Sequence, residues 1–148
     1  MEIRFEHGAA ASVACDALIV PIAPGEIANG SGGLASTMPV ALAGDVASLA
    51  ADASFDGEVA ATLVVPTLGQ APARRIVLTG TGAGDRAGED AVARAFGAAA
   101  QAARSAGARR LAAMLPTGSD ALSTADAVSA AVSGAMLGLY RYTEHFGA

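Results

Sequence analysis

The chain has 148 residues, of which 53% are hydrophobic and 16% are charged. This length corresponds to about one globular domain, and the composition excludes an intrinsically disordered protein, because its apolar surface can offset the entropy lost on ordering. The net charge of −5 disfavours nucleic acid as a partner, since binding to a phosphate backbone requires a basic surface.

The first part of the chain predicts two strands and one helix. Ile3 and Phe5 alternate with charged neighbours, a pattern typical of a half-buried edge strand. Residues 17–22 form a continuous apolar run, which indicates a strand covered on both faces. A glycine-rich loop at residues 29–33 follows, and residues 34–53 predict a helix.

The rest of the chain predicts three more strands and two more helices. Residues 60–65 and 75–80 are β-rich and are joined by a turn, so we expect them to pair antiparallel. Residues 85–106 predict a long helix, residues 111–115 a strand, and residues 123–142 a final helix.

Both of these helices carry an apolar stripe that identifies the face expected to be buried. In the helix at 85–106 the stripe consists of Val92, Phe96, Ala99 and Ala103. In the final helix it consists of Val128, Val132, Ala135, Met136 and Leu139. Ser123 begins this last helix as an N-cap, with Asp126 at the position of a capping-box acid.

Strands alternating with helices predict one domain, residues 1–148, with an α/β fold. We expect a three-layer α/β/α sandwich with a mixed sheet. Neither a repeat nor a linker interrupts the pattern.

Cysteine content and termini indicate a cytoplasmic protein. Cys15 is the only cysteine, so no internal disulfide can form, and we expect it to be a buried apolar residue. The charged N-terminus does not resemble a signal peptide, and no apolar run approaches the ~20 residues of a membrane-spanning helix.

All nine basic residues are arginines, and most of them are scattered along the chain. The two doublets, Arg74-Arg75 and Arg109-Arg110, each precede an apolar run. We interpret each doublet as the solvated entrance to a strand.

No motif for catalysis or metal binding is found. His7 and His145 have no ligating residue at metal-site spacing, and no serine stands in a nucleophile elbow. We therefore expect neither catalytic residues nor metal ligands in this chain.

Two glycine clusters could form an anion-binding loop. The first cluster, Gly80, Gly82 and Gly84, lies between a predicted strand and a predicted helix, where backbone N–H groups can bind phosphate. It fits a loose dinucleotide fingerprint, but no acidic residue follows the next strand. The second follows an aspartate-led strand and resembles the loop with which macrodomains cradle the diphosphate of ADP-ribose. The candidate residues are Asp16, Gly30, Gly32, Gly33, Gly80, Gly82 and Gly84.

Four segments resemble, in the right order, the N-terminal domain of the M17 leucyl (cytosol) aminopeptidase family. Residues 16–20 look like its second strand, and residues 55–58 look like the turn after its first helix. Residues 68–82 are similar to its arginine-led central strand, and residues 133–142 to the helix that precedes the catalytic domain.

The resemblance implies a macrodomain-like fold and an accessory role. In the family, catalysis belongs to a C-terminal peptidase domain that binds two divalent metal ions, Zn or Mn, and that domain's motifs are absent from residues 1–148. The implied partners are that peptidase domain and a homo-oligomer, a hexamer in the family. The alternative is a macrodomain-type module that binds ADP-ribose or another nucleotide.

Overall fold

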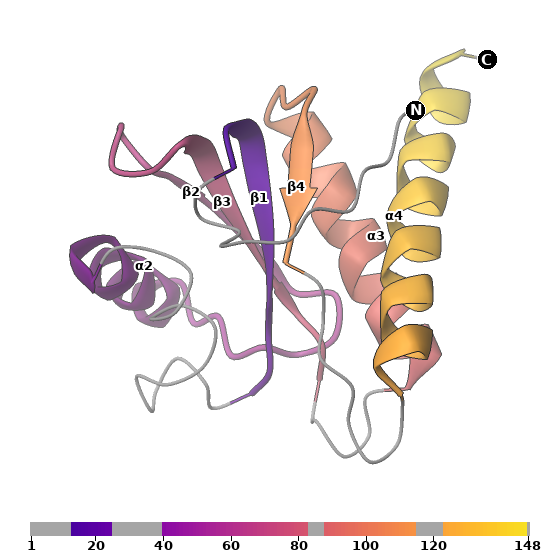
Figure 1. The fold of residues 1–148 in the computed structure, drawn as a ribbon, viewed down its shortest axis with the longest axis horizontal. Coiled ribbons are helices and arrows are strands. Elements are labelled where there is room, and N and C mark those ends of the chain that lie inside the picture. Colours follow the sequence, from indigo (N-terminus) through magenta and orange to yellow (C-terminus); the bar gives the residue numbers. More distant parts are fainter. Residues whose placement is uncertain (1–12, 25–39, 83–87, 115–122, 148) are drawn as a thin grey trace.

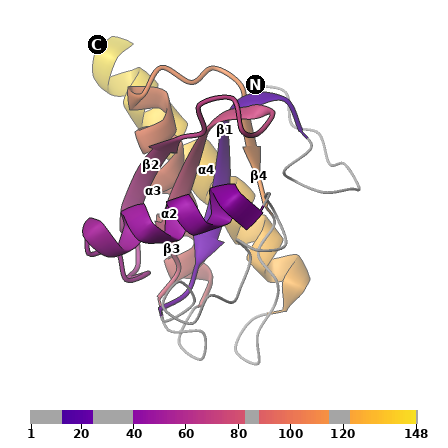
Figure 2. The ribbon, with the colours of Figure 1, turned by 90° about the vertical axis from the view of Figure 1, so that its left-hand side faces the viewer.

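The computed structural model describes residues 13–24, 40–82, 88–114 and 123–147. Its strands are β1 (Cys15–Ile22), β2 (Thr62–Pro66), β3 (Ala73–Gly80) and β4 (Leu111–Ala113), and its helices are α2 (Val40–Asp52), α3 (Glu89–Ser105) and α4 (Thr124–Gly147). The sheet lies between α2 and α3, and α4 packs on the outer side of α3 (Figure 1). Figure 2 shows the same layers from the side of α2.

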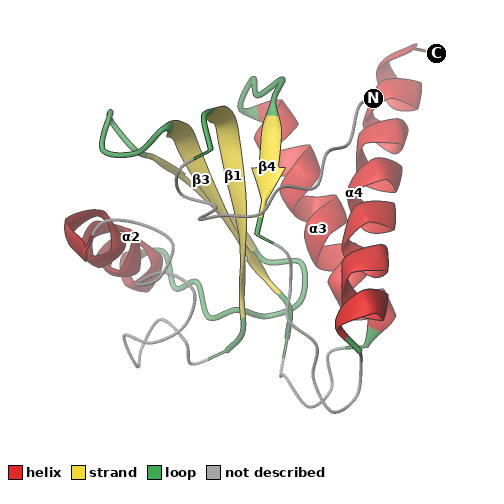
Figure 3. Cartoon of the chain, in the orientation of Figure 1, coloured by secondary structure: helices red, strands yellow, loops and turns green. Residues whose placement is uncertain are grey.

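The sheet has the order β2-β3-β1-β4 and is mixed. β1 pairs in parallel with both β3 and β4, whereas β2 pairs antiparallel with β3. The predicted mixed sheet with helices on both faces is therefore confirmed (Figure 3). The predicted antiparallel pair is confirmed by the register of β2 with β3. Because Ala17 lies opposite Arg75 and Leu111, the three parallel strands begin at the same end of the sheet.

β1 supplies core residues to both faces of the sheet. Leu18, Val20 and Ile22 pack in the cluster beneath α2, while Ala17 and Ile19 pack in the cluster beneath α3. This alternation follows from the two-residue period of a strand, and burial of both faces explains why the predicted run is continuously apolar.

α3 contacts the sheet with the stripe that the sequence predicts: Val92, Phe96, Ala99 and Ala103 are all buried. Gly107 follows the helix with a φ of +91°, as expected of a glycine after a helix end. The hydroxyl of Thr79 on β3 donates a hydrogen bond to the carbonyl oxygen of Ala95, 2.7 Å away, and ties the sheet to this helix.

The predicted buried face of α4 is wrong in its main members. Met136 is 44% exposed, and Val128, Val132, Ala135 and Leu139 are only partly buried. Over residues 124–139, where side-chain burial is described, the buried residues of α4 are small ones, namely Ala127, Ala130, Ala131, Gly134 and Gly138. The N-cap is confirmed, since the backbone N–H of Asp126 donates to the hydroxyl of Ser123 at 3.2 Å.

Glycines set the spacing of α3 and α4. A Cβ atom at Gly134 would overlap the carbonyl oxygen of Ala93, and one at Gly138 would lie 2.7 Å from the carbonyl oxygen of Gly97. Gly134 on α4 lies against Ala93 on α3, and Gly138 lies against Gly97, so the two helices run in the same direction. Two backbones this close exclude large side chains from the middle of the contact, which explains the exposure of Met136.

Some predicted features cannot be compared with the structure. The strand at Ile3 and Phe5 and the loop at 29–33 lie outside the described residues. The helix predicted from residue 34 is described only from Val40 onward.

Replacement of Gly134 by alanine is expected to lower the free energy of unfolding by roughly 1–3 kcal/mol, because the added methyl group forces two helix backbones apart. Urea unfolding followed by circular dichroism measures this change. Gly44 is the matched control, because it also lies inside a helix but a Cβ atom there would meet nothing within 4 Å. Gly44→Ala should raise stability by about 0.5–1 kcal/mol through helix propensity. Similar changes in the free energy of unfolding for both variants would contradict the close contact between α3 and α4.

Candidate functional site

The turn that follows β3 is closed by a crossing segment, residues 57–59. Gly57 and Gly82 have φ angles of +85° and +78°. A side chain at Gly80 would overlap the carbonyl oxygen of Glu58, and one at Gly82 would place its Cβ 2.5 Å from Val59 Cγ2. Glycine at these positions therefore lets the crossing segment lie directly against the end of β3.

The amides of this turn are hydrogen bonded within the fold. The N–H groups of residues 80, 81 and 82 donate, at 2.8, 3.0 and 3.0 Å, to the carbonyl oxygens of Ala61, Ile22 and Gly57. An anion-binding loop instead directs such amides at its ligand. In open α/β sheets, ligands bind outside the carboxyl ends of the strands, where this chain places the crossing segment.

The structure brings only some of the predicted anion-loop residues together. Gly80 and Gly82 lie beside Gly57, whereas Asp16 lies at the opposite edge of the sheet, because Ile22 rather than Asp16 pairs with Gly80. The remaining candidates, Gly30, Gly32, Gly33 and Gly84, lie outside the described residues. Ligand binding by these residues stays a prediction.

Asp16 instead joins β1 to the chain entering β4. Its Oδ2 atom accepts hydrogen bonds from the backbone N–H groups of Arg109, at 2.9 Å, and Arg110, at 3.0 Å. These two bonds, together with the positive charges of Arg74 and Arg75, lower the pKa of the Asp16 carboxyl below its ordinary value. The aspartate thereby anchors β4, which is only three residues long.

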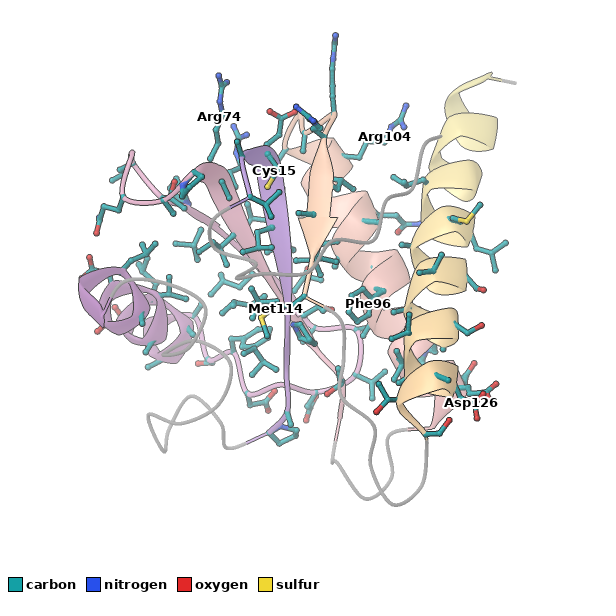
Figure 4. All side chains as sticks on the ribbon, in the orientation of Figure 1. Cys15, Arg74, Phe96, Arg104, Met114 and Asp126 are labelled. Atoms are coloured by element: carbon teal, nitrogen blue, oxygen red, sulfur yellow. The ribbon has the colours of Figure 1, made fainter. Side chains whose placement is uncertain are left out.

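Both arginine doublets gather around Asp16. Arg74 and Arg75 begin β3 on one side of β1, and Arg109 and Arg110 precede β4 on the other. We call these four residues the basic edge. Arg74 is labelled there in Figure 4, and Arg104, in the last turn of α3, lies at the same end of the molecule. The sequence interpretation treated each doublet alone and missed their proximity, which depends on parallel strand pairing.

Cys15 has the buried apolar character expected of it. It is 8% exposed, and its thiol donates to the carbonyl oxygen of Ala17 at 3.4 Å. Burial raises the pKa of the Cys15 thiol, which disfavours the reactive thiolate.

The described residues do not offer a metal-binding set. Within the ranges described, no three histidine, cysteine, aspartate or glutamate residues form a group able to hold a metal ion. Over the same ranges, no helix has both the length and the hydropathy needed to span a bilayer.

Comparison with protein families identifies the chain. Residues 20–145, which are most of the sequence, match the family described as "Cytosol aminopeptidase family, N-terminal domain". The chain belongs to this family, as its N-terminal domain. The resemblance seen in the sequence to the M17 aminopeptidases is thus confirmed.

A curated relative of this cytosol aminopeptidase N-terminal domain is much longer than the chain. The "Probable cytosol aminopeptidase" of Geotalea uraniireducens (strain Rf4) is 34% identical over 105 residues, which cover 71% of this chain. The match spans 21% of that relative, so the chain corresponds to about a fifth of its length.

Solved structures share the fold of this N-terminal domain. "Bottromycin maturation enzyme BotP in complex with Mn" matches with a TM-score of 0.65 at 22% identity, over 88% of this chain and 24% of that one. A second structure, "Bottromycin maturation enzyme BotP", has a TM-score of 0.64 at 23% identity, over 91% of this chain and 25% of that one. At these identities the likeness concerns the fold alone.

The carboxylate of Asp16 is expected to make stability fall in acid. Its pKa is lower in the folded than in the unfolded chain, so its contribution is complete above the unfolded value of about 4 and is lost as pH falls through the folded value. Asp16→Asn should therefore lose less stability than the parent sequence between about pH 5 and pH 2. Thermal melts across this range test the difference, with Asp45→Asn, an exposed change on α2, as control. Parallel profiles for Asp16→Asn and the parent sequence would contradict the linkage.

Proposed function

We propose that this chain is the non-catalytic accessory and assembly domain of a metal-dependent leucyl aminopeptidase. Residues 1–148 act as one domain, and a C-terminal peptidase domain of the same polypeptide removes N-terminal amino acids from peptides. The observation that carries the proposal is the family match over residues 20–145. The length of the relative named as a probable cytosol aminopeptidase supports it, because most of that protein lies outside the matched region.

Two divalent ions, Zn or Mn, are the metals we assign to the peptidase domain. The described residues of this chain do not fit such a centre, because they contain no group of three potential ligands. We assign the catalytic steps to the peptidase domain and none to the accessory domain. It packs on the peptidase domain, contributes to a hexamer and restricts access to the interior of the assembly, in the cytoplasm.

Features of the fold suit a supporting domain better than a ligand-binding one. The crossing segment lies against the end of β3, and the amides of residues 80–82 already bond to carbonyl oxygens. The sheet is fastened to α3 by Thr79, and α3 to α4 by their glycine contact. Such features favour a rigid platform over an opening cleft.

The chain by itself is expected to show no aminopeptidase activity. With leucine p-nitroanilide and added Mn²⁺ or Zn²⁺, p-nitroaniline release should equal that of a mock purification from cells lacking the gene. The polypeptide that also contains the downstream reading frame should release p-nitroaniline in a metal-dependent manner. Metal-dependent turnover by the 148-residue chain above the mock level would sink the proposal.

ADP-ribose is expected not to bind, which separates this function from the macrodomain-type alternative. Isothermal titration calorimetry with millimolar ADP-ribose should give only the heat of dilution, because the amides of residues 80–82 have partners within the chain. A saturable heat that disappears in Gly82→Ala would favour the nucleotide-binding module instead. The control is Gly69→Ala, at another position with a positive φ, where a Cβ would have nothing within 4 Å.

A further inference from the structure

The basic edge lies at the end of the molecule where α4 finishes. β1, β3 and β4 all start at this edge, and α3 runs toward it, since its last turn leads into Arg109 and β4. α4 is parallel to α3 and therefore ends on the same side (Figure 1). The four arginines and the end of α4 consequently lie at the same end of the domain.

α4 extends beyond the end of α3 at this side. The side-chain amide of Gln101 on α3 donates to the carbonyl oxygen of Gly138 at 3.4 Å. From there α3 continues for only about one turn, to Ser105, whereas α4 continues to Gly147. The last turns of α4 therefore project past α3 (Figure 1).

Among the residues whose side chains the structure describes, positive charge gathers at one end of the domain and negative charge at the other. At the basic edge Arg74, Arg109 and Arg110 are exposed, and Asp16 among them is engaged by two backbone amides. The opposite end carries exposed acidic residues from the crossing segment and from the first turns of α3 and α4, as Figure 4 shows for Asp126. These acidic residues are Glu58, Glu89, Asp90 and Asp126.

We propose that the basic edge is the surface on which the peptidase domain docks, through an acidic face of that domain. This inference rests on the proposed function, which places a peptidase domain after this one. Two observations choose the occupant. α4 ends at this side, where under the proposed function the peptidase domain would follow, and about four fifths of the curated relative lies outside the matched region. The exposed arginines suit an acidic partner, because guanidinium groups pair with carboxylates in a bidentate geometry.

An acidic protein face fits this surface better than a nucleic acid does. The chain as a whole is acidic, with a net charge of −5, so a long polyanion would be repelled beyond the contact itself. Among the described residues of the basic edge and its strands there is no aromatic side chain on which a base could stack. Nucleic acid is therefore treated as an outcome that would overturn the proposal.

The test uses the full-length polypeptide and the double variant Arg109→Glu with Arg110→Glu. Only side chains change, so the backbone amides that bind Asp16 are retained. Limited digestion with proteinase K reports how tightly the two domains are docked, through cleavage of the connection after α4. We expect the variant to be cleaved about tenfold faster, and the unmodified protein to approach this rate near 0.5 M salt.

Two further variants control for charge and for folding. Arg94→Glu makes the same kind of reversal at an exposed position in the first half of α3, away from the basic edge, and should be cleaved at the unmodified rate. Arg109→Gln with Arg110→Gln removes the charge without reversing it, and should give an intermediate rate. This milder pair answers the question if the reversed pair does not fold.

The possible failures can be told apart. An active full-length aminopeptidase whose glutamate and glutamine variants are cleaved like Arg94→Glu would overturn the docking surface alone. A full-length protein without metal-dependent aminopeptidase activity would overturn the proposed function and this inference together. Binding of a 20-base-pair duplex that is lost in the double variant, with unchanged cleavage, would assign the surface to nucleic acid.

Discussion

The parallel pairing of β1 with both β3 and β4 is the constraint on which the other features depend. It buries β1 on both faces, and it requires helical crossovers that cover the sheet on either side. It also places every parallel strand start at one edge and every parallel strand end at the other. Residues that are distant in the chain therefore come together at each end of the domain, and the side chains at the two ends differ.

At one end of the sheet the crossing segment closes the turn after β3, while the other end carries the basic edge. At the carboxyl ends of the strands, three glycines allow residues 57–59 to occupy the space where related architectures hold ligands. At the opposite end, Asp16 anchors the entrance to β4, and the four arginines of the basic edge lie on the strands to either side of β1 or just before them. This arrangement supports the proposal that the domain acts through contact with another protein domain.

Small residues replace bulky ones in much of this fold. Aromatic residues make up 4% of the chain and tryptophan is absent, so the layers must be held by close approach rather than by large side chains. α3 buries four alanines beside Phe96, and α4 meets α3 through glycine. Close contact of backbones maximises dispersion and leaves little freedom for the layers to slide. In the accessory role proposed above, such packing would preserve the position of the surface that the domain presents.

Local sequence patterns were sufficient to predict most helices and strands and to identify the family. Periodicity located β1, β3 and α3 to within a few residues, because a strand or helix that buries a face imposes its own spacing on apolar residues. The buried side of α4 was not predictable in this way, since hydrophobicity ranks Met136 above Gly134 whereas the approach of α3 favours the glycine. Likewise, the glycine turn could be recognised after β3, but not the crossing segment that closes it.

The separation of Asp16 from Gly80 and the gathering of the two arginine doublets followed only from the tertiary structure. Strand order and direction decide which chain-distant residues become neighbours, and no short stretch of sequence encodes them. The amino-acid pattern alone was enough to predict an α/β domain of this family and to show that its sequence lacks recognisable catalytic motifs. The packed sheet decided that the crossing segment lies at one end and the arginines at the other, because pairing β1 in parallel on both sides assigns each strand terminus to one end of the sheet.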